Sequence, residues 1–453
     1  MLDLKIINGT AIIPGVGAVE TGIGCKDGKI VALADASELG EATRVVDATG
    51  KYVIPGVIDP HCHLGIFTGD FGYEAEHETR AALAGGITTV GVFMGGADPY
   101  LPQLPGVIET AESKISTDLF LHLSMFTPDQ LDEVPKCVED FGITDYKFYM
   151  TGVRGVFPNV SDAFILEGLR RIGAIDERLL GCVHAEDQSM VDAAWDNLEC
   201  TYGESGAGDL CEWAKVGPYE AEELAVIRAC YLARVSGTRL YIVHLSSEPG
   251  LLAADEFRPE NLYVETTSPY LSMTKNSEAG LMAKMVPPIK DESDREALWE
   301  GVRLDIIDSF GTDNTPLTKE IKGAERGMMG TLPGYPVIQT HLAVLLNEGV
   351  NKRGIPLETI VEKACANPAR IFNLYPKKGT IAVGSDADLV LIDLDKEVTV
   401  KAADLYSFAD FSLWEGQTFK GWPVMTIKGG VVAVEDNDIK VAAGTGKYLR
   451  RDL

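Results

Sequence analysis

Two histidines one residue apart follow an apolar segment near the start of the chain. His61 and His63 come after residues 52–58, which read YVIPGVI. Successive side chains of an extended strand alternate faces, so both imidazoles point the same way and Cys62 points the opposite way. Two imidazoles on one face form a chelating pair of the kind that zinc favours. Metal chemistry is therefore the first hypothesis.

Four further residues suited to metal binding or acid–base chemistry end or closely follow strand-like runs. They are Lys147, His184, His244 and Asp313, and successive positions lie 37, 60 and 69 residues apart. These spacings equal one or two β–α units each, at roughly 30 residues per unit. If the runs are parallel strands, the six side chains meet at one edge of the sheet.

Each of these residues alone also has a structural explanation. A histidine at a strand end is commonly a hydrogen-bonded core or surface residue. Lys147 alone suits a surface cation, and Asp313 suits a turn or helix cap because its neighbours are Thr312 and Asn314. The joint pattern favours one shared site.

The middle of the chain, about 53–372, alternates apolar strand-like runs with amphipathic helices, which is typical of a parallel sheet. Segments 88–93, 240–244 and 262–265 are examples of the strands, and 220–236 and 357–369 of the helices. About 320 residues suit a TIM (β/α)8 barrel with insertions, and no GxGxxG follows the first strand. We therefore expect α/β architecture, with the chemistry at the carboxyl ends of the strands.

Both chain ends read as short strands joined by tight turns. Asn8-Gly9 and Asp27-Gly28 are hairpin signals between such runs. Neither end has enough strands for a sandwich alone, so residues 1–52 and 373–440 are predicted to combine into one small β-sandwich. Residues 441–453 form a C-terminal tail, which we expect to serve as an oligomer contact.

The composition argues against several classes of protein. Forty Lys and Arg against 68 Asp and Glu give a net charge of −28, and no basic patch is visible, which argues against nucleic-acid binding. No uncharged apolar run approaches a membrane span, and the N-terminus carries charge at once. The eight cysteines form no CxxC pair or regular framework, which favours reduced thiols and a cytoplasmic protein.

The motifs in order resemble the amidohydrolase superfamily, specifically its hydantoinase/dihydropyrimidinase and dihydroorotase branch, over nearly the whole chain. The segments that carry the resemblance are 55–63, 81–89, 146–148, 184–186, 244–246, 367–372, 378–381, 384–389 and 444–451. The resemblance implies a hydrolase of carbon–nitrogen bonds in a cyclic amide, imide or ureide. It also implies a homotetramer or homodimer.

The resemblance further implies two divalent metal ions, most often zinc, with manganese as an alternative. His61, His63 and Asp313 would hold one ion, and His184 with His244 the other. Lys147, carbamylated by carbon dioxide, would bridge both as an anionic oxygen ligand. A hydroxide shared by the metals would attack the carbonyl, and Asp313 would carry its proton to the leaving nitrogen.

The departures from the family pattern concern the substrate. Hydantoinases place a tyrosine five residues after the lysine, where this chain has Gly152, and Tyr149 is the candidate replacement. Dihydroorotases place an arginine two residues after the second histidine, where this chain has Gly65. Arg326, in a segment that resembles the substrate loop, could bind an anionic group through its planar fork.

Further positions have simpler interpretations. His77, His122 and His341 match no motif and are interpreted as structural, and the loop 66–73 is a candidate lid over the site.

Three alternatives remain open. Allantoinase-like and dihydroorotase-like enzymes differ from a hydantoinase only in the ring they open and in carboxylate recognition. A catalytically silent scaffold, as in the collapsin response mediator proteins, lacks metal ligands, whereas all six ligand positions are filled here.

Overall fold

The computed structural model describes residues 1–203, 206–451 and 453. Its largest sheet holds eight neighbouring parallel strands, which bears out the predicted TIM barrel. The strands are β8 (Val57–Cys62), β9 (Ile87–Met94), β10 (Asp118–Ser124), β11 (Asp145–Tyr149), β12 (Leu180–His184), β13 (Arg239–Ile242), β14 (Leu262–Thr267) and β15 (Ser309–Gly311).

Backbone bonds join the first and last strands of this sheet. The amide of Asp313 donates to the carbonyl of His61 at 2.8 Å, and the amide of His63 donates to the carbonyl of Asn314 at 2.8 Å. Thr312 reinforces the closure, because its amide and hydroxyl donate to the buried carboxylate of Asp59 at 3.0 and 2.7 Å. The residues around the candidate aspartate therefore seal the barrel.

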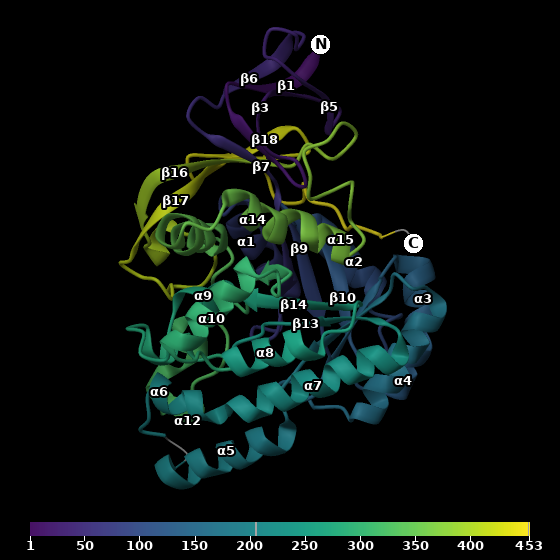
Figure 1. Ribbon diagram of the computed structural model, residues 1–453, viewed down its shortest axis with the longest axis vertical. Helices are drawn as coiled ribbons and strands as arrows, with labels where there is room; N and C mark the ends of the chain where they lie inside the picture. The colour runs from purple at the N-terminus through teal and green to yellow at the C-terminus, as the bar shows by residue number, and fades with distance from the viewer. Residues whose placement is uncertain (204–205, 452) are drawn as a thin grey trace.

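Helices surround the barrel (Figure 1). They are α1 (Phe71–Ala84), α2 (Leu104–Lys114), α3 (Pro128–Phe141), α4 (Asp162–Ile175), α5 (Gln188–Tyr202), α6 (Leu210–Trp213), α7 (Tyr219–Ser236), α8 (Glu248–Phe257), α9 (Ser268–Ser272), α10 (Glu292–Arg303), α11 (Lys319–Lys322), α12 (Gly327–Gly330), α13 (His341–Val344), α14 (Leu357–Val361) and α15 (Asn367–Ile371). The helix predicted over 357–369 is divided, because a π-helical turn (Glu362–Ala366) separates α14 from α15.

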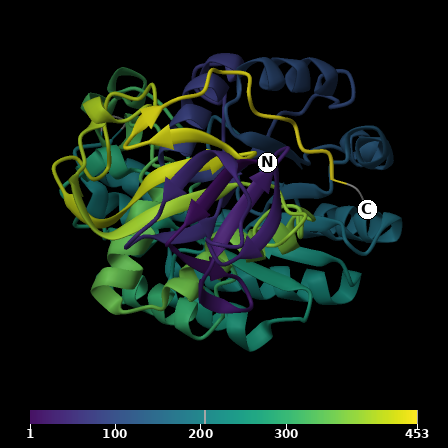
Figure 2. The ribbon, with the colours of Figure 1, turned by 90° about the horizontal axis from the view of Figure 1, so that it is seen from above.

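Two smaller sheets pack together at one end of the molecule, above the barrel in Figure 1. The first contains β1 (Leu2–Ile7), β4 (Gly22–Lys26), β5 (Lys29–Ala34) and β6 (Ala42–Asp47). The second contains β2 (Thr10–Ile13), β3 (Gly17–Glu20), β7 (Tyr52–Pro55), β16 (Leu389–Thr399), β17 (Thr418–Lys428), β18 (Val431–Glu435) and β19 (Asp438–Ile439). Both chain ends thus share one sheet, as Figure 2 shows from above. The predicted domain limits themselves stay a prediction.

One predicted hairpin is wrong and the other is confirmed. Asp27-Gly28 joins β4 to β5 as expected. Asn8-Gly9, by contrast, joins β1 to β2, and these two strands do not pair with each other. β1 pairs with β4 and β6, and β2 pairs with β3 and β7. Ala48 explains this difference, since its amide donates to the Ile7 carbonyl and brings β6 beside β1. After β1 the chain crosses to the second sheet, where it forms β2.

The C-terminal tail lies along its own barrel. The amide of Leu449 donates to the carbonyl of Leu119 at 2.7 Å, and the buried guanidinium of Arg451 pairs with Asp145 at the start of β11. Asp452 in the predicted tail lies outside the described residues. An oligomer contact through this tail therefore stays a prediction.

Over the described ranges, no helix has the length and apolar character needed to cross a membrane.

Candidate functional site

The six predicted residues lie at the carboxyl ends of five barrel strands. His61 lies in β8 with His63 directly after it, Lys147 lies in β11 and His184 ends β12. His244 and Asp313 each follow their strand, β13 and β15, by two residues. Because parallel strands present their carboxyl ends at one edge, residues up to 252 positions apart in the chain meet there.

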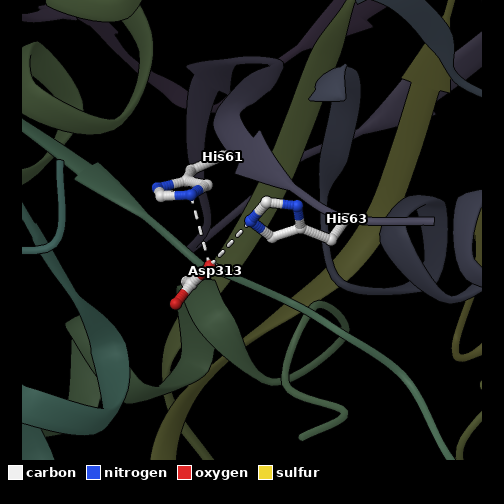
Figure 3. Close-up of side chains that lie close together, drawn as sticks. All are labelled: His61, His63 and Asp313. Carbon is white, nitrogen blue, oxygen red and sulfur yellow. Dashed lines mark ion pairs between the residues drawn. The ribbon is translucent and has the colours of Figure 1, made fainter. Parts of the chain in front are cut away.

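His61, His63 and Asp313 form a compact cluster, with their side chains pointing toward one another (Figure 3). The Oδ1 atom of Asp313 lies 3.2 Å from Nε2 of His61 and 3.3 Å from Nε2 of His63. One possible ligand atom from each residue lies within 4.8 Å of the others. Lys147 adjoins the cluster, with Nζ 3.2 Å from Nε2 of His61.

His184 and His244 form a second group beside the first. Their ring centroids are 4.5 Å apart, and the rings of His244 and His61 lie 5.5 Å apart. The Nε2 atom of His184 is engaged by Oε2 of Glu186 at 2.9 Å, which leaves Nδ1 for a metal ion. All six predicted residues are thus brought together.

Burial sets the charge of these groups. It lowers the pKa of His61 and His244 well below the ordinary value and also lowers the pKa of His63, so these imidazoles are neutral with a free lone pair. Burial lowers the pKa of Lys147 to about 8. Burial alone would raise the pKa of Asp313, but the facing rings of His61 and His63 and the amine of Lys147 favour its carboxylate and lower the pKa.

Sequence reasoning missed a buried carboxylate that holds two of the histidines. Oε1 of Glu265, in β14, lies 2.8 Å from Nδ1 of His61 and accepts from the backbone amide of His244 at 3.0 Å. Its other oxygen accepts from the hydroxyl of Tyr241 at 2.8 Å. The available signal was a carboxylate inside an apolar strand. Such a partner fixes the ring and tautomer of a metal-binding histidine.

Two of the six residues have a backbone conformation that side chains rarely adopt. His244 has φ 41° and Asp313 has φ 51°, both in the left-handed region. Their backbones persist there because the amide of His244 is held by Glu265 and that of Asp313 by the carbonyl of His61. Such backbones cluster at functional sites.

A cavity opens over the cluster, with an empty volume of about 530 Å³ that includes space open to solvent. The residues that line it are His63, Ile66, Phe67, Lys147, Tyr149, Val153, Val156, Phe157, His184, His244, Met285, Val286, Asp313, Thr315, Pro333, Gly334 and Tyr335. Apart from the candidate metal-binding residues, the wall is mostly aliphatic and aromatic. Within this described lining, Lys147 is the one lysine and no arginine occurs.

Close backbone contacts explain the two glycines that depart from the family pattern. Gly65 has φ 78°, and a Cβ atom there would meet the backbone of Phe71 at 3.2 Å. A Cβ atom on Gly152 would meet the carbonyl oxygen of Phe157 at 2.6 Å. Neither the arginine of dihydroorotases nor the tyrosine of hydantoinases fits at these positions without a change in the backbone.

The two predicted substrate-binding residues lie in different places. Tyr149 is buried in the cavity wall, and its hydroxyl, beside Ser124, has no well-oriented hydrogen-bond partner in the described part of the chain. Arg326 does not line the cavity, and its guanidinium donates to the carbonyls of Glu320 and Ile321 at 3.1 and 3.2 Å. The structure thus gives no support to the predicted role of Arg326.

The other histidines make structural contacts. Nδ1 of His77 lies 2.9 Å from the Tyr73 carbonyl, Nε2 of His122 lies 3.0 Å from the Pro60 carbonyl, and Nδ1 of His341 lies 3.1 Å from the hydroxyl of Ser268.

The candidate lid contributes two side chains to the cavity. Ile66 and Phe67 line it, while Glu74 accepts from the amide of Gly65 and the hydroxyl of Thr68. Movement of this loop stays a prediction.

Comparison with known proteins places the chain among hydrolases. Residues 250–433 match the amidohydrolase family model. An L-hydantoinase of Paenarthrobacter aurescens is 31% identical over 100% of this chain and 98% of its own length. An allantoinase of Bacillus licheniformis is 30% identical over 95% of each chain. A D-hydantoinase crystal structure superposes with TM-score 0.91 at 30% identity, covering 100% of this chain and 99% of that one.

Proposed function

Because the chain belongs to the hydantoinase branch of the amidohydrolase family, we propose that it hydrolyses the C–N amide bond of a cyclic amide, imide or ureide. One observation carries the proposal. Four imidazoles, one lysine and one aspartate converge at the barrel mouth beside an apolar cavity. A silent scaffold would not need this donor set.

The donor set fits two divalent metal ions, with zinc favoured and manganese as the alternative. Neutral imidazoles and a carboxylate are the ligands that zinc takes in hydrolytic sites. His61, His63 and Asp313 would hold one ion, and His184 with His244 the other. When bound, such ions polarise a carbonyl group and lower the pKa of water.

Lys147 would complete the site as a carbamate. Burial lowers its pKa to about 8, so part of the population carries the neutral amine that reacts with carbon dioxide. The neutral amine forms a new N–C bond to carbon dioxide and loses one proton. Counted from the ammonium form, two protons are released, and a cation becomes an anionic ligand with two oxygens. That change suits a position 3.2 Å from Nε2 of His61.

Asp313 and Tyr149 would carry the remaining chemistry. The Asp313 carboxylate would take a proton from the attacking water and deliver it to the leaving ring nitrogen. Tyr149 lines the cavity, and its buried hydroxyl, which has no well-oriented hydrogen-bond partner within the described residues, would donate to the substrate carbonyl oxygen as negative charge develops there.

The cavity lining favours a neutral ring with an apolar or aromatic substituent. Phe67, Val153 and Phe157 line it, and no arginine does within the described residues. A carboxylated ring of the dihydroorotase type would therefore lack a cationic partner. Allantoinase activity is the second candidate, because an allantoinase is 30% identical over most of both chains.

We also infer a homotetramer or homodimer in the cytoplasm. Leu224, Tyr231 and Val235 on α7 are exposed at positions spaced by seven and four residues, which places them along one face of a helix. Such an exposed apolar stripe suits contact with another copy. All eight cysteines are unpaired, which suits a reducing compartment. Light scattering should give two or four chains per particle, and a monomer would contradict this assembly.

The test is ring opening by protein loaded with zinc or manganese. We expect turnover of neutral 5-substituted hydantoins above that of allantoin and of carboxylated rings. Turnover of allantoin alone would replace the hydantoinase assignment with the second candidate. No turnover of any ring would overturn the proposed function.

A further inference from the structure

Tyr335 places a phenol against the candidate catalytic aspartate. Its side chain is buried and lines the cavity, and its hydroxyl donates to Oδ2 of Asp313 at 3.2 Å. The other oxygen, Oδ1, faces His61 and His63. The two oxygens of one carboxylate thus have different partners. A hydrogen bond to one of them resists rotation about the Cβ–Cγ bond, which would exchange them.

The backbone around Tyr335 is held from three directions. Nζ of Lys322, itself fully buried, donates to the carbonyl of Gly334 at 2.6 Å. The amide of Thr315 donates to the carbonyl of Tyr335 at 3.2 Å, and Oδ1 of Asn314 accepts from the amide of Val337 at 2.8 Å. A side chain fixed by such supports is pre-organised for its partner.

Two of these supports come from residues that directly follow Asp313. Asn314 and Thr315 bind the segment that carries Tyr335, so the aspartate and the phenol belong to one hydrogen-bonded unit. The left-handed backbone of Asp313 is part of that unit. A shift of either segment would therefore move both groups together.

On the basis of the proposed function, we propose that Tyr335 is a positioning residue. It holds Asp313 with Oδ1 toward the metal-binding histidines and Oδ2 toward the cavity. A hydrogen bond to a ligating carboxylate typically affects metal affinity or rate by about 10- to 100-fold. Loss of the hydroxyl alone should therefore act on metal binding and kcat, with little effect on KM.

The test compares Tyr335→Phe with wild type and with Tyr219→Phe. Tyr219 is a matched control, because its hydroxyl donates to Asp294 at 2.9 Å on another part of the barrel. Metal-free protein is titrated with Co2+, and kcat and KM are measured on a 5-substituted hydantoin. We expect Tyr335→Phe to bind Co2+ about 10-fold more weakly and to lose about 10- to 100-fold in kcat. The Co2+ affinity and kcat of Tyr219→Phe should stay within about twofold of wild type, since this variant leaves Asp313 untouched.

The two readouts separate this inference from the proposed function. Unchanged Co2+ affinity and unchanged kcat in Tyr335→Phe would overturn the positioning role while leaving hydantoin hydrolysis intact. Weakened Co2+ binding in Tyr335→Phe, with a wild type that opens no ring, would support positioning and refute the proposed reaction. Equal losses in Tyr335→Phe and Tyr219→Phe would also overturn the inference, because they would indicate a general structural effect.

Discussion

The amine of Lys147 lies 3.2 Å from Nε2 of His61, and both side chains are buried beneath the cavity. A cation facing a metal-binding nitrogen would repel a divalent ion, whereas a carbamate at the same position would bind it. The proposed two-metal site therefore requires the Lys147 carbamate.

Lys147→Ala should lose the two-metal site and turnover. The variant removes the proposed bridging anion, so we expect elemental analysis to show fewer than two metal ions per chain and activity below detection. Lys136→Ala, at an exposed position, serves as the control and should keep the wild-type metal content. Retention of two tightly bound metals by Lys147→Ala would contradict the assignment.

Asp313→Ala should separate metal binding from proton transfer. The histidines remain, so part of the metal should stay bound, while the loss of the proton carrier lowers kcat by at least about 10³-fold. Rapid-mixing or steady-state kinetics on metal-loaded protein would measure this. Turnover at the wild-type rate would exclude a proton role for Asp313.

Phe157→Ala should weaken recognition of aromatic substituents. Phe157 lines the cavity with its ring centroid 5.2 Å from that of Tyr149. Truncation should lower kcat/KM for a 5-aryl hydantoin about 10- to 100-fold and affect unsubstituted hydantoin much less. Equal losses for both rings would contradict an aromatic subsite.

Arg326→Ala tests the one predicted side chain that the structure places away from the cavity. Because its guanidinium binds backbone carbonyls, we expect unchanged kinetics on neutral and carboxylated rings alike. A selective loss on carboxylated rings would restore its predicted role in anion binding.

Lys284 should make stability depend on pH. It is buried with Nζ donating to the Met328 carbonyl at 2.7 Å, and burial lowers its pKa to about 7. The nearby Lys322 also has a pKa lowered well below the ordinary value by burial and by Lys284. Between about pH 7 and pH 10 the unfolded chain holds a proton that folded Lys284 has released, so the free energy of unfolding rises with pH.

Lys284→Met should remove that contribution. Chemical unfolding at pH 7, 8 and 9 should show that the free energy of unfolding rises more steeply with pH in wild type than in the variant. The difference in slope should reach up to about 1.4 kcal/mol per pH unit. The same pH slope in both proteins would contradict a neutral buried lysine.

The convergence of the six candidate metal ligands was predictable because it depends on local rules. Alternation along β8 puts His61 and His63 on one face, and parallel strands bring Lys147 and His184 to the same edge. Neither rule requires knowledge of side-chain packing.

The partners of those ligands were not predictable in the same way. Glu265 meets His61 across 204 residues, and Tyr335 meets Asp313 through a loop rather than a strand. No periodicity encodes either contact. The hairpin predicted at Asn8-Gly9 was also wrong, because the pairing of β1 with β6 outweighs the hairpin tendency of the turn.

Removal and return of the metal shows whether ring opening depends on bound ions. Turnover of a neutral 5-substituted hydantoin is measured on wild-type protein before chelation, after chelation, and after reloading with zinc or manganese in the presence of bicarbonate. We expect chelation to abolish ring opening and reloading to restore it. Ring opening that survives complete metal removal would contradict a metal-dependent hydrolase.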